Sequence, residues 1–160
     1  MKKLLVIDQE KCTLCKRCEL VCSLKHEGEC RPAKARVNVA SFPDDFFWMP
    51  VTCQQCDEPV CKEVCPAGAI SANEASGAVE INEDKCIGCR MCVMACPFGA
   101  MSYSAAGEVA VKCDLCGGEP ECALFCPSGA IEYKEADEAY ISRRRAVGLK
   151  LRDALKEVKL

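Results

Sequence analysis

The chain has 160 residues, a formal net charge of −3 and 17 cysteines. This length suits one domain or two very small ones, and the cysteine content is typical of a disulfide scaffold or a metal protein. An odd number of cysteines cannot pair completely, only four apolar residues are consecutive near the N-terminus, and no stretch is long enough to span a membrane. We therefore expect a reduced, cytoplasmic, metal-binding protein without membrane insertion.

Short strands are predicted where apolar and β-branched residues lie between turn-forming residues. A hairpin is expected from ARVNVA (35–40) and FFWMPV (46–51), with its turn at Ser41–Asp45. The other predicted strands are KLLVI (3–7), GAVEI (77–81), GAMSY (99–103), EVAVK (108–112) and GAIEY (129–133). The predicted fold class is α+β, with short antiparallel hairpins, one-turn helices, cluster-binding loops and a longer helix only at the C-terminus.

Sixteen cysteines fall into four groups of four, and the groups repeat. Groups one and three share the spacing C-x2-C-x2-C-x3-C at an offset of 74 residues, and groups two and four align at an offset of 60 or 61. The groups are, in order, Cys12, Cys15, Cys18, Cys22; Cys53, Cys56, Cys61, Cys65; Cys86, Cys89, Cys92, Cys96; and Cys113, Cys116, Cys122, Cys126. The chain is therefore an internal duplication of a unit that holds two groups.

The spacing within the groups indicates [4Fe–4S] clusters. Three closely spaced cysteines can reach three corners of one cubane, and the fourth, one helical turn later, points away from that loop. In two-cluster bacterial ferredoxins this fourth cysteine, followed by proline, binds the other cluster. The proline is present at Pro66, Pro97 and Pro127, whereas Ser23 follows Cys22. Zinc sites commonly use two C-x2-C pairs and do not require this pattern, so four [4Fe–4S] clusters are predicted instead.

This order of sixteen cysteines, over about residues 3–133, resembles the four-cluster ferredoxin-like subunits of complex oxidoreductases such as dimethyl sulfoxide reductase, formate dehydrogenase and formate-linked hydrogenase. The segment CELVCSLKHEGECRPAKARVNV is similar to the small subunits that accompany bacterial tungsten aldehyde oxidoreductases and benzoyl-CoA reductases. The resemblance implies a non-catalytic electron-transfer subunit whose partner is a catalytic subunit of the tungsten or molybdenum type. Further copies of the chain, or a flavin- or NAD-linked subunit, are additional partners that the resemblance allows.

The resemblance also implies that ligands are shared crosswise, between groups one and four and between groups two and three. The implied sets are Cys12, Cys15, Cys18, Cys126; Cys22, Cys113, Cys116, Cys122; Cys53, Cys56, Cys61, Cys96; and Cys65, Cys86, Cys89, Cys92. An inner ferredoxin-like fold, about 51–104, would then be inserted in an outer one within 1–133. The sequence alone also fits pairing of adjacent groups. Crosswise sharing requires the strand at Leu4–Ile7 to lie near Ala130–Tyr133.

Several residues lie outside the predicted ligand sets. Cys30 is expected to be a non-ligand, either buried or merely tolerated, and His26 is expected to make a structural hydrogen bond or to tune a nearby potential. Seven basic residues adjoin cysteines, either as solvated surface or to offset cluster charge: Lys11, Lys16, Arg17, Lys62, Lys85, Arg90 and Lys112.

The segment 134–160 is predicted to be a helical tail beyond the clusters. Its residues 143–160 include seven basic and two acidic residues, and an apolar stripe recurs at three- and four-residue steps: Val147, Leu151, Leu155 and Val158. The helix either folds back onto its own domain or serves as a docking tail for a partner.

The sequence shows no substrate chemistry, since it has no phosphate-binding glycine loop, no nucleotide fingerprint and no recognisable acid–base pair. Clusters with thiolate at all four corners leave no open coordination site, so one-electron transfer remains. The favoured interpretation is an electron-transfer subunit of a larger complex. A free-standing polyferredoxin is the alternative. A cluster-based redox sensor should carry an output domain such as a DNA-binding helix pair, and none is visible, so no nucleic-acid partner is expected.

Overall fold

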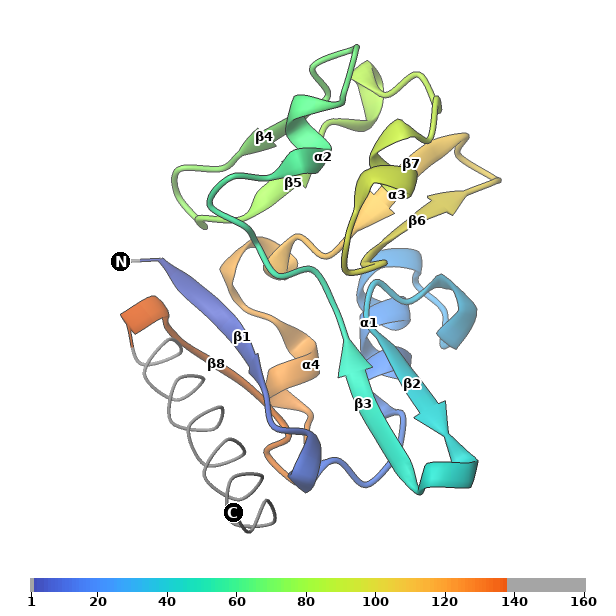
Figure 1. The fold of residues 1–160 in the computed structure, drawn as a ribbon, viewed down its shortest axis with the longest axis vertical. Helices are drawn as coiled ribbons and strands as arrows, with labels where there is room; N and C mark the ends of the chain where they lie inside the picture. Colours follow the sequence, from blue (N-terminus) through green and yellow to red (C-terminus); the bar gives the residue numbers. More distant parts are fainter. Residues whose placement is uncertain (1, 138–160) are drawn as a thin grey trace, which may run out of the picture.

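The computed structural model of the protein describes residues 2–137. Over this range eight strands form four two-stranded antiparallel sheets (Figure 1). The pairs are β1 (Lys3–Ile7) with β8 (Ile131–Glu135), β2 (Asn38–Phe42) with β3 (Phe47–Val51), β4 (Ile70–Ala72) with β5 (Val79–Ile81), and β6 (Met101–Ser104) with β7 (Val109–Lys112). The α-helices wholly within these residues are α1 (Arg17–Glu27), α2 (Val60–Glu63), α3 (Met91–Ala95) and α4 (Glu121–Leu124).

The mixed α+β fold with short hairpins agrees with the sequence prediction. Each predicted run overlaps a strand, and β2 and β3 form the expected hairpin, although its connection is 43–46 instead of 41–45. The short strand β4 was not predicted, because it has only three residues and one of them, Ser71, is polar. The predicted tail, 134–160, lies mostly outside the described residues. No helix within 2–137 has the length and apolar character needed to cross a membrane.

Helix α1 is longer than predicted, with eleven residues instead of one turn. Proline follows the last cysteine of the other three groups, and proline disfavours a helical conformation in the residue before it. Ser23 stands at this position in group one, so α1 continues to Gly28, whose left-handed φ of 72° ends it. The Ser23 side chain is fully buried and its oxygen accepts a hydrogen bond from the Arg31 amide at 2.9 Å. The longer helix therefore has a specific local cause.

The first and last described strands lie side by side, as crosswise sharing requires. In the register of β1 and β8, Leu5 faces Tyr133, and Asp8 donates its backbone N–H to the Ala130 carbonyl at 2.9 Å. The pair of β4 and β5 corresponds to the pair of β1 and β8, because β4 ends the first repeat and β5 begins the second. The last strand of each repeat thus pairs with the first strand of the other, which matches the duplication seen in the sequence.

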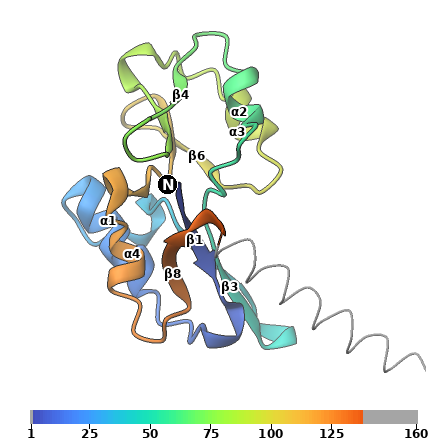
Figure 2. The same cartoon turned by 90° about the vertical axis from the view of Figure 1, so that its left-hand side faces the viewer.

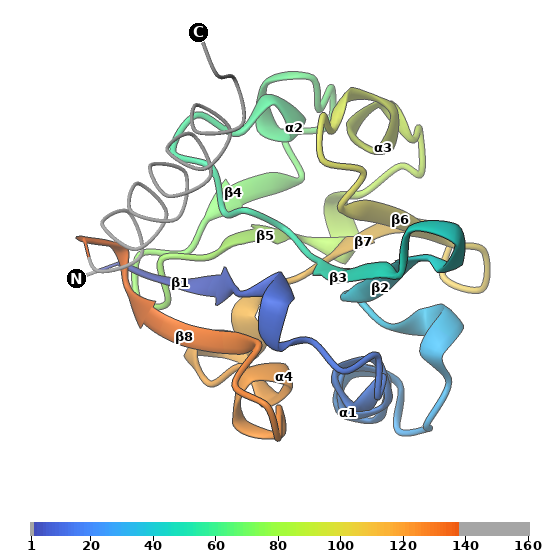
Figure 3. The ribbon, with the colours of Figure 1, turned by 60° about the horizontal axis from the view of Figure 1, so that its bottom comes forward.

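Residues 2–137 contain two main hydrophobic cores, and cysteines belong to both. One core contains cysteines of groups one and four around Val37, Val39 and Ile131, and the other contains cysteines of groups two and three around Ile70, Val79 and Met101. Figure 2 shows α1 and α4 together in one half and α2 and α3 in the other. Figure 3 shows strands running between these two helix pairs. A small third core, with Cys113 and Leu115 packed against Cys53, joins the halves.

Candidate metal centres

Three cavities are each lined by four cysteines, three from one group and one from another. The sets are Cys12, Cys15, Cys18 and Cys126; Cys53, Cys56, Cys61 and Cys96; and Cys65, Cys86, Cys89 and Cys92. In each case the fourth cysteine comes from the group that shares the same hydrophobic core. The structure therefore brings together three of the four sets named from the sequence.

The fourth set lies where α1 packs on α4. Cys22 is in α1, and the packing of this helix on α4 brings Cys22 close to the cysteines of group four. Burial raises the pKa of the Cys122 thiol, and the neighbouring Cys113, Cys22, Cys116 and Cys18 raise it further because like charges repel. Three of these neighbours complete the fourth set, whereas Cys18 belongs to the set of Cys12.

The first C-x2-C loop of every group has the same backbone shape. The residue before its second cysteine has a left-handed conformation, with φ of 57° at Leu14, 50° at Gln55, 66° at Gly88 and 58° at Leu115. A left-handed residue curves the backbone so that successive backbone N–H groups point toward the concave side of the loop. The amides of Gln55 and Leu115 accordingly donate to the sulfurs of Cys53 and Cys113, each at 3.5 Å.

Other backbone amides also point at cysteine sulfur. Arg36 donates its N–H to Cys22 Sγ at 3.2 Å, and Ala69 donates to Cys65 Sγ at 3.3 Å. Such hydrogen bonds favour the thiolate, which is the form that binds metal. Burial has the opposite effect and raises the pKa of Cys18 to about 12, so metal must displace a proton there. The donor set, four thiols with amides directed at them, fits an iron–sulfur cluster.

A known protein family matches this arrangement. The family described as a 4Fe-4S dicluster domain matches residues 44–136, which is more than half of the chain. The chain belongs to the 4Fe-4S dicluster domain family. Its cofactors are therefore 4Fe-4S clusters, and its sixteen grouped cysteines fit four of them.

Individual relatives of this chain are named as subunits of oxidoreductases. The polyferredoxin-like subunit of aliphatic sulfonate oxidoreductase from Pyrococcus furiosus is 45% identical over 94 residues, which cover 58% of this chain and 53% of that protein. A subunit of anaerobic dimethyl sulfoxide reductase from Escherichia coli is 37% identical over 112 residues, covering 61% of this chain and 53% of that subunit. The chain thus spans about half the length of the curated relatives it matches.

Among solved structures, the chain matches one from the active site complex BamBC of benzoyl coenzyme A reductase in complex with benzoyl-CoA. The aligned chain of that complex is 22% identical, with a TM-score of 0.48, and the alignment covers 96% of each chain.

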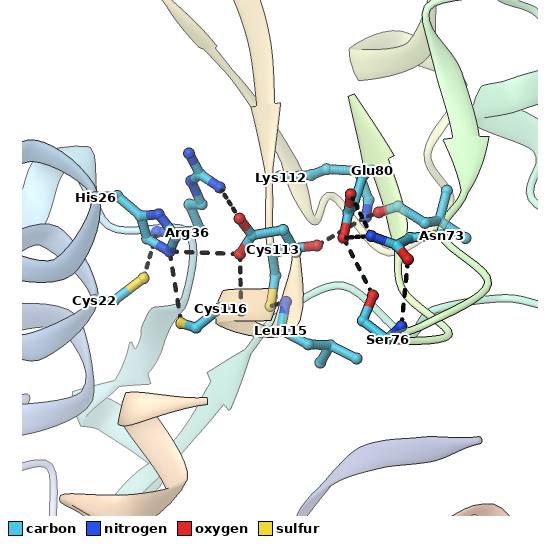
Figure 4. Close-up of polar contacts among 12 residues, drawn as sticks. Cys22, His26, Arg36, Asn73, Ser76, Glu80, Lys112, Cys113, Leu115 and Cys116 are labelled. Carbon is cyan, nitrogen blue, oxygen red and sulfur yellow. Dashed lines mark hydrogen bonds and ion pairs between the residues drawn. The ribbon is translucent and has the colours of Figure 1, made fainter. Parts of the chain in front are cut away.

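His26 lies beside group four. Its Nε2 atom is 3.6 Å from Cys116 Sγ and 3.5 Å from Asp114 Oδ1, and Arg36 donates to the other Asp114 oxygen at 2.8 Å (Figure 4). Burial lowers the pKa of His26, and the positive charge of Arg36 lowers it further, while the carboxylate of Asp114 opposes the shift. The hydrogen bond to Cys116 agrees with the expected structural or tuning role.

Cys30 lines none of the three cavities that hold twelve of the other cysteines, and it is exposed. Of the two alternatives for this surplus thiol, the buried one is therefore wrong. It stands in the segment after α1, beyond Gly28, and is tolerated at the surface.

The roles of two buried polar residues, Gln55 and Lys112, become visible only in the structure. Gln55 was not singled out in the sequence, where apolar residues or glycine occupy the same loop position in the other groups. A polar residue at that position is the signal that could have found it, because its side chain is buried and doubly hydrogen-bonded. Lys112 was one of seven basic residues beside cysteines, and in the structure it is buried while the other six are exposed.

Proposed function

We propose that the protein is a non-catalytic electron-transfer subunit with four [4Fe–4S] clusters. It would relay electrons between a catalytic oxidoreductase subunit, of the tungsten or molybdenum type, and a redox partner. When bound, such clusters supply one-electron transfer. The observation that carries the proposal is the gathering of sixteen thiols into four sets across two joined cores.

The proposed ligand sets are the four crosswise ones. Three cavities lined by such sets support this assignment, and so does the division of the cysteines between two cores. Adjacent pairing would instead require groups one and two to share a core. In the corresponding domain organisation, an inner ferredoxin-like unit of about 51–104 would lie within an outer unit of 1–133. The proposed tail, 134–160, begins with the last two residues of β8, which pair with β1.

The names of the relatives support the proposed partner class. The matching proteins include subunits of aliphatic sulfonate oxidoreductase, dimethyl sulfoxide reductase and selenate reductase. We infer that this chain, which shares their cysteine-rich region, transfers electrons to or from a catalytic subunit. We further propose a cytoplasmic location, because all seventeen cysteines are free of disulfides.

The proposal predicts that the protein purifies as part of a larger complex. Under anaerobic conditions and low salt, the native mass should equal that of this chain plus a second, different subunit that binds tungsten or molybdenum. Native mass spectrometry with elemental analysis measures both. A purified species with the mass of one chain and a full load of iron would instead identify a free-standing polyferredoxin.

The tail provides a second arm of the same experiment. Strand β8 continues to Glu135, and the Ala136 amide bonds to the Lys2 carbonyl at 2.8 Å, so truncation after Asp137 removes none of these contacts. If the tail is a docking segment, the truncated chain should keep its iron and fail to co-purify with its partner. Loss of iron, or unchanged co-purification, would show that the tail serves its own domain.

A further inference from the structure

Lys112 carries a positive charge into the interior of the protein. The residue ends β7 and is 3% exposed. Its ammonium group donates hydrogen bonds to two backbone carbonyls, that of Val79 and that of Cys113, the latter at 2.8 Å. A buried charge without an opposite charge is strongly disfavoured, because neutral carbonyls replace only part of its hydration.

The nearby acidic residues do not neutralise Lys112. A polar cavity beside it is also lined by Glu80, Glu83 and Asp114. Within residues 2–137, no carboxylate forms an ion pair with Lys112. Glu80 instead accepts hydrogen bonds from Asn73, as Figure 4 shows, and Asp114 pairs with Arg36. The partner of this charge must therefore be something else.

A closed set of hydrogen bonds holds the ammonium group in place. The Gln55 carboxamide donates to the Cys113 carbonyl at 2.9 Å and accepts from the Val79 amide at 2.8 Å. Lys112 bonds to the carbonyls of the same two residues. Gln55 is itself 2% exposed, so this arrangement is built inside the protein and does not depend on solvent.

The ammonium group lies between two cysteine sets. Lys112 lines the cavity of Cys53, Cys56, Cys61 and Cys96, and it binds the backbone of Cys113, which belongs to the fourth set. One cation therefore lies beside both sets. These two sets are the central ones, because Cys53 and Cys113 pack together where the two halves join.

We propose that Lys112 is the permanent countercharge of the two central clusters and raises the reduction potential of both. This inference rests on the proposed function. A [4Fe–4S] cluster with four thiolates is negative and becomes more so on reduction, so a nearby buried cation stabilises the reduced form. Low polarity strengthens this interaction relative to that of an exposed lysine. The cluster charge in turn supplies the partner that Lys112 lacks among the side chains.

The test compares two lysines with the same position relative to a cysteine. Lys112 directly precedes Cys113, and Lys85 directly precedes Cys86 but is exposed. Anaerobic redox titration followed by electron paramagnetic resonance gives the midpoint potentials. In Lys112→Met, the equilibrium constant for reduction should fall tenfold or more at two of the four clusters. For one electron, this lowers each of those two midpoint potentials by about 59 mV or more. Lys85→Met should leave all four unchanged. Any other pattern in Lys112→Met would overturn the proposal.

A second measurement applies if Lys112→Met binds too little iron for titration. Iron loss to a chelator is then followed for the oxidised and the dithionite-reduced protein, in the wild type and the variant. A countercharge role predicts that the variant loses iron disproportionately fast when reduced, whereas a packing role predicts equal acceleration in both states. The second result would overturn the proposal. Failure of the proposed function is separate, since it would appear as a deficit of iron in the wild type.

Discussion

Complete removal of iron is expected to unfold the protein and not merely to bleach it. Among the residues that the structure describes, few large apolar side chains are fully buried, including Leu115, Ile131 and Val37, and cysteines make up much of both main cores. Each sheet has only two strands, an arrangement that is marginal in water without further packing. The bound metal must therefore supply a large part of the folding free energy.

The cysteine loops increase this dependence. Leu14, Gln55 and Leu115 hold left-handed conformations that cost about 1–3 kcal/mol each for residues other than glycine. Structural zinc contributes about 10–16 kcal/mol in small zinc-finger peptides. Four clusters on sixteen thiolates are expected to contribute at least as much, so their loss exceeds the usual stability of a domain, about 5–15 kcal/mol.

Far-ultraviolet circular dichroism, recorded together with iron content during anaerobic chelation, tests this expectation. The two signals should disappear together, and addition of iron and sulfide should restore both. Native circular dichroism after complete iron removal would show that the polypeptide alone maintains the fold.

Replacement of Cys22 by serine is expected to destroy a cluster whose other ligands lie in group four. Cys22 is 6% exposed, and its sulfur accepts a hydrogen bond from the Arg36 amide. Loss of this thiolate should lower the iron content by about four atoms per chain, one cubane of four. Cys30→Ser is the matched control, because it changes the same residue type nearby at an exposed position. The control should keep all of its iron.

The identity of the lost cluster distinguishes crosswise from adjacent pairing. Under crosswise sharing, Cys22→Ser and Cys116→Ser should remove the same electron paramagnetic resonance signal. Under adjacent pairing, Cys22→Ser should instead match Cys56→Ser. Equal iron in Cys22→Ser and Cys30→Ser would mean that Cys22 is not a ligand.

The repeat in the sequence accounts for how much of the fold could be predicted. Strands flank each cysteine group at matching positions in both repeats, so β1, β5 and β7 could be located from local pattern alone. The adjacency of β1 and β8 followed from the resemblance and is confirmed by their register. The length of α1 could also have been predicted, since Ser23 replaces the proline that ends the corresponding helices.

The features that escaped prediction depend on tertiary contacts. Lys112 and Lys85 have the same position before a cysteine, and nothing local reveals that one is buried and the other exposed. Burial of Lys112 results from the packing of β7 beside β5, which brings the Val79 carbonyl to its ammonium group. Gln55 is likewise explained by residues far away in the chain, Val79 and Cys113. Propensity and spacing carry no information about such contacts.

Iron and acid-labile sulfide per chain, measured on anaerobically purified protein, test the central claim most directly. Four cubanes on the sixteen grouped cysteines predict about 16 iron and about 16 sulfide atoms per chain. A reproducible value near half of this, with a clean two-cluster electron paramagnetic resonance signal, would contradict the four-cluster account.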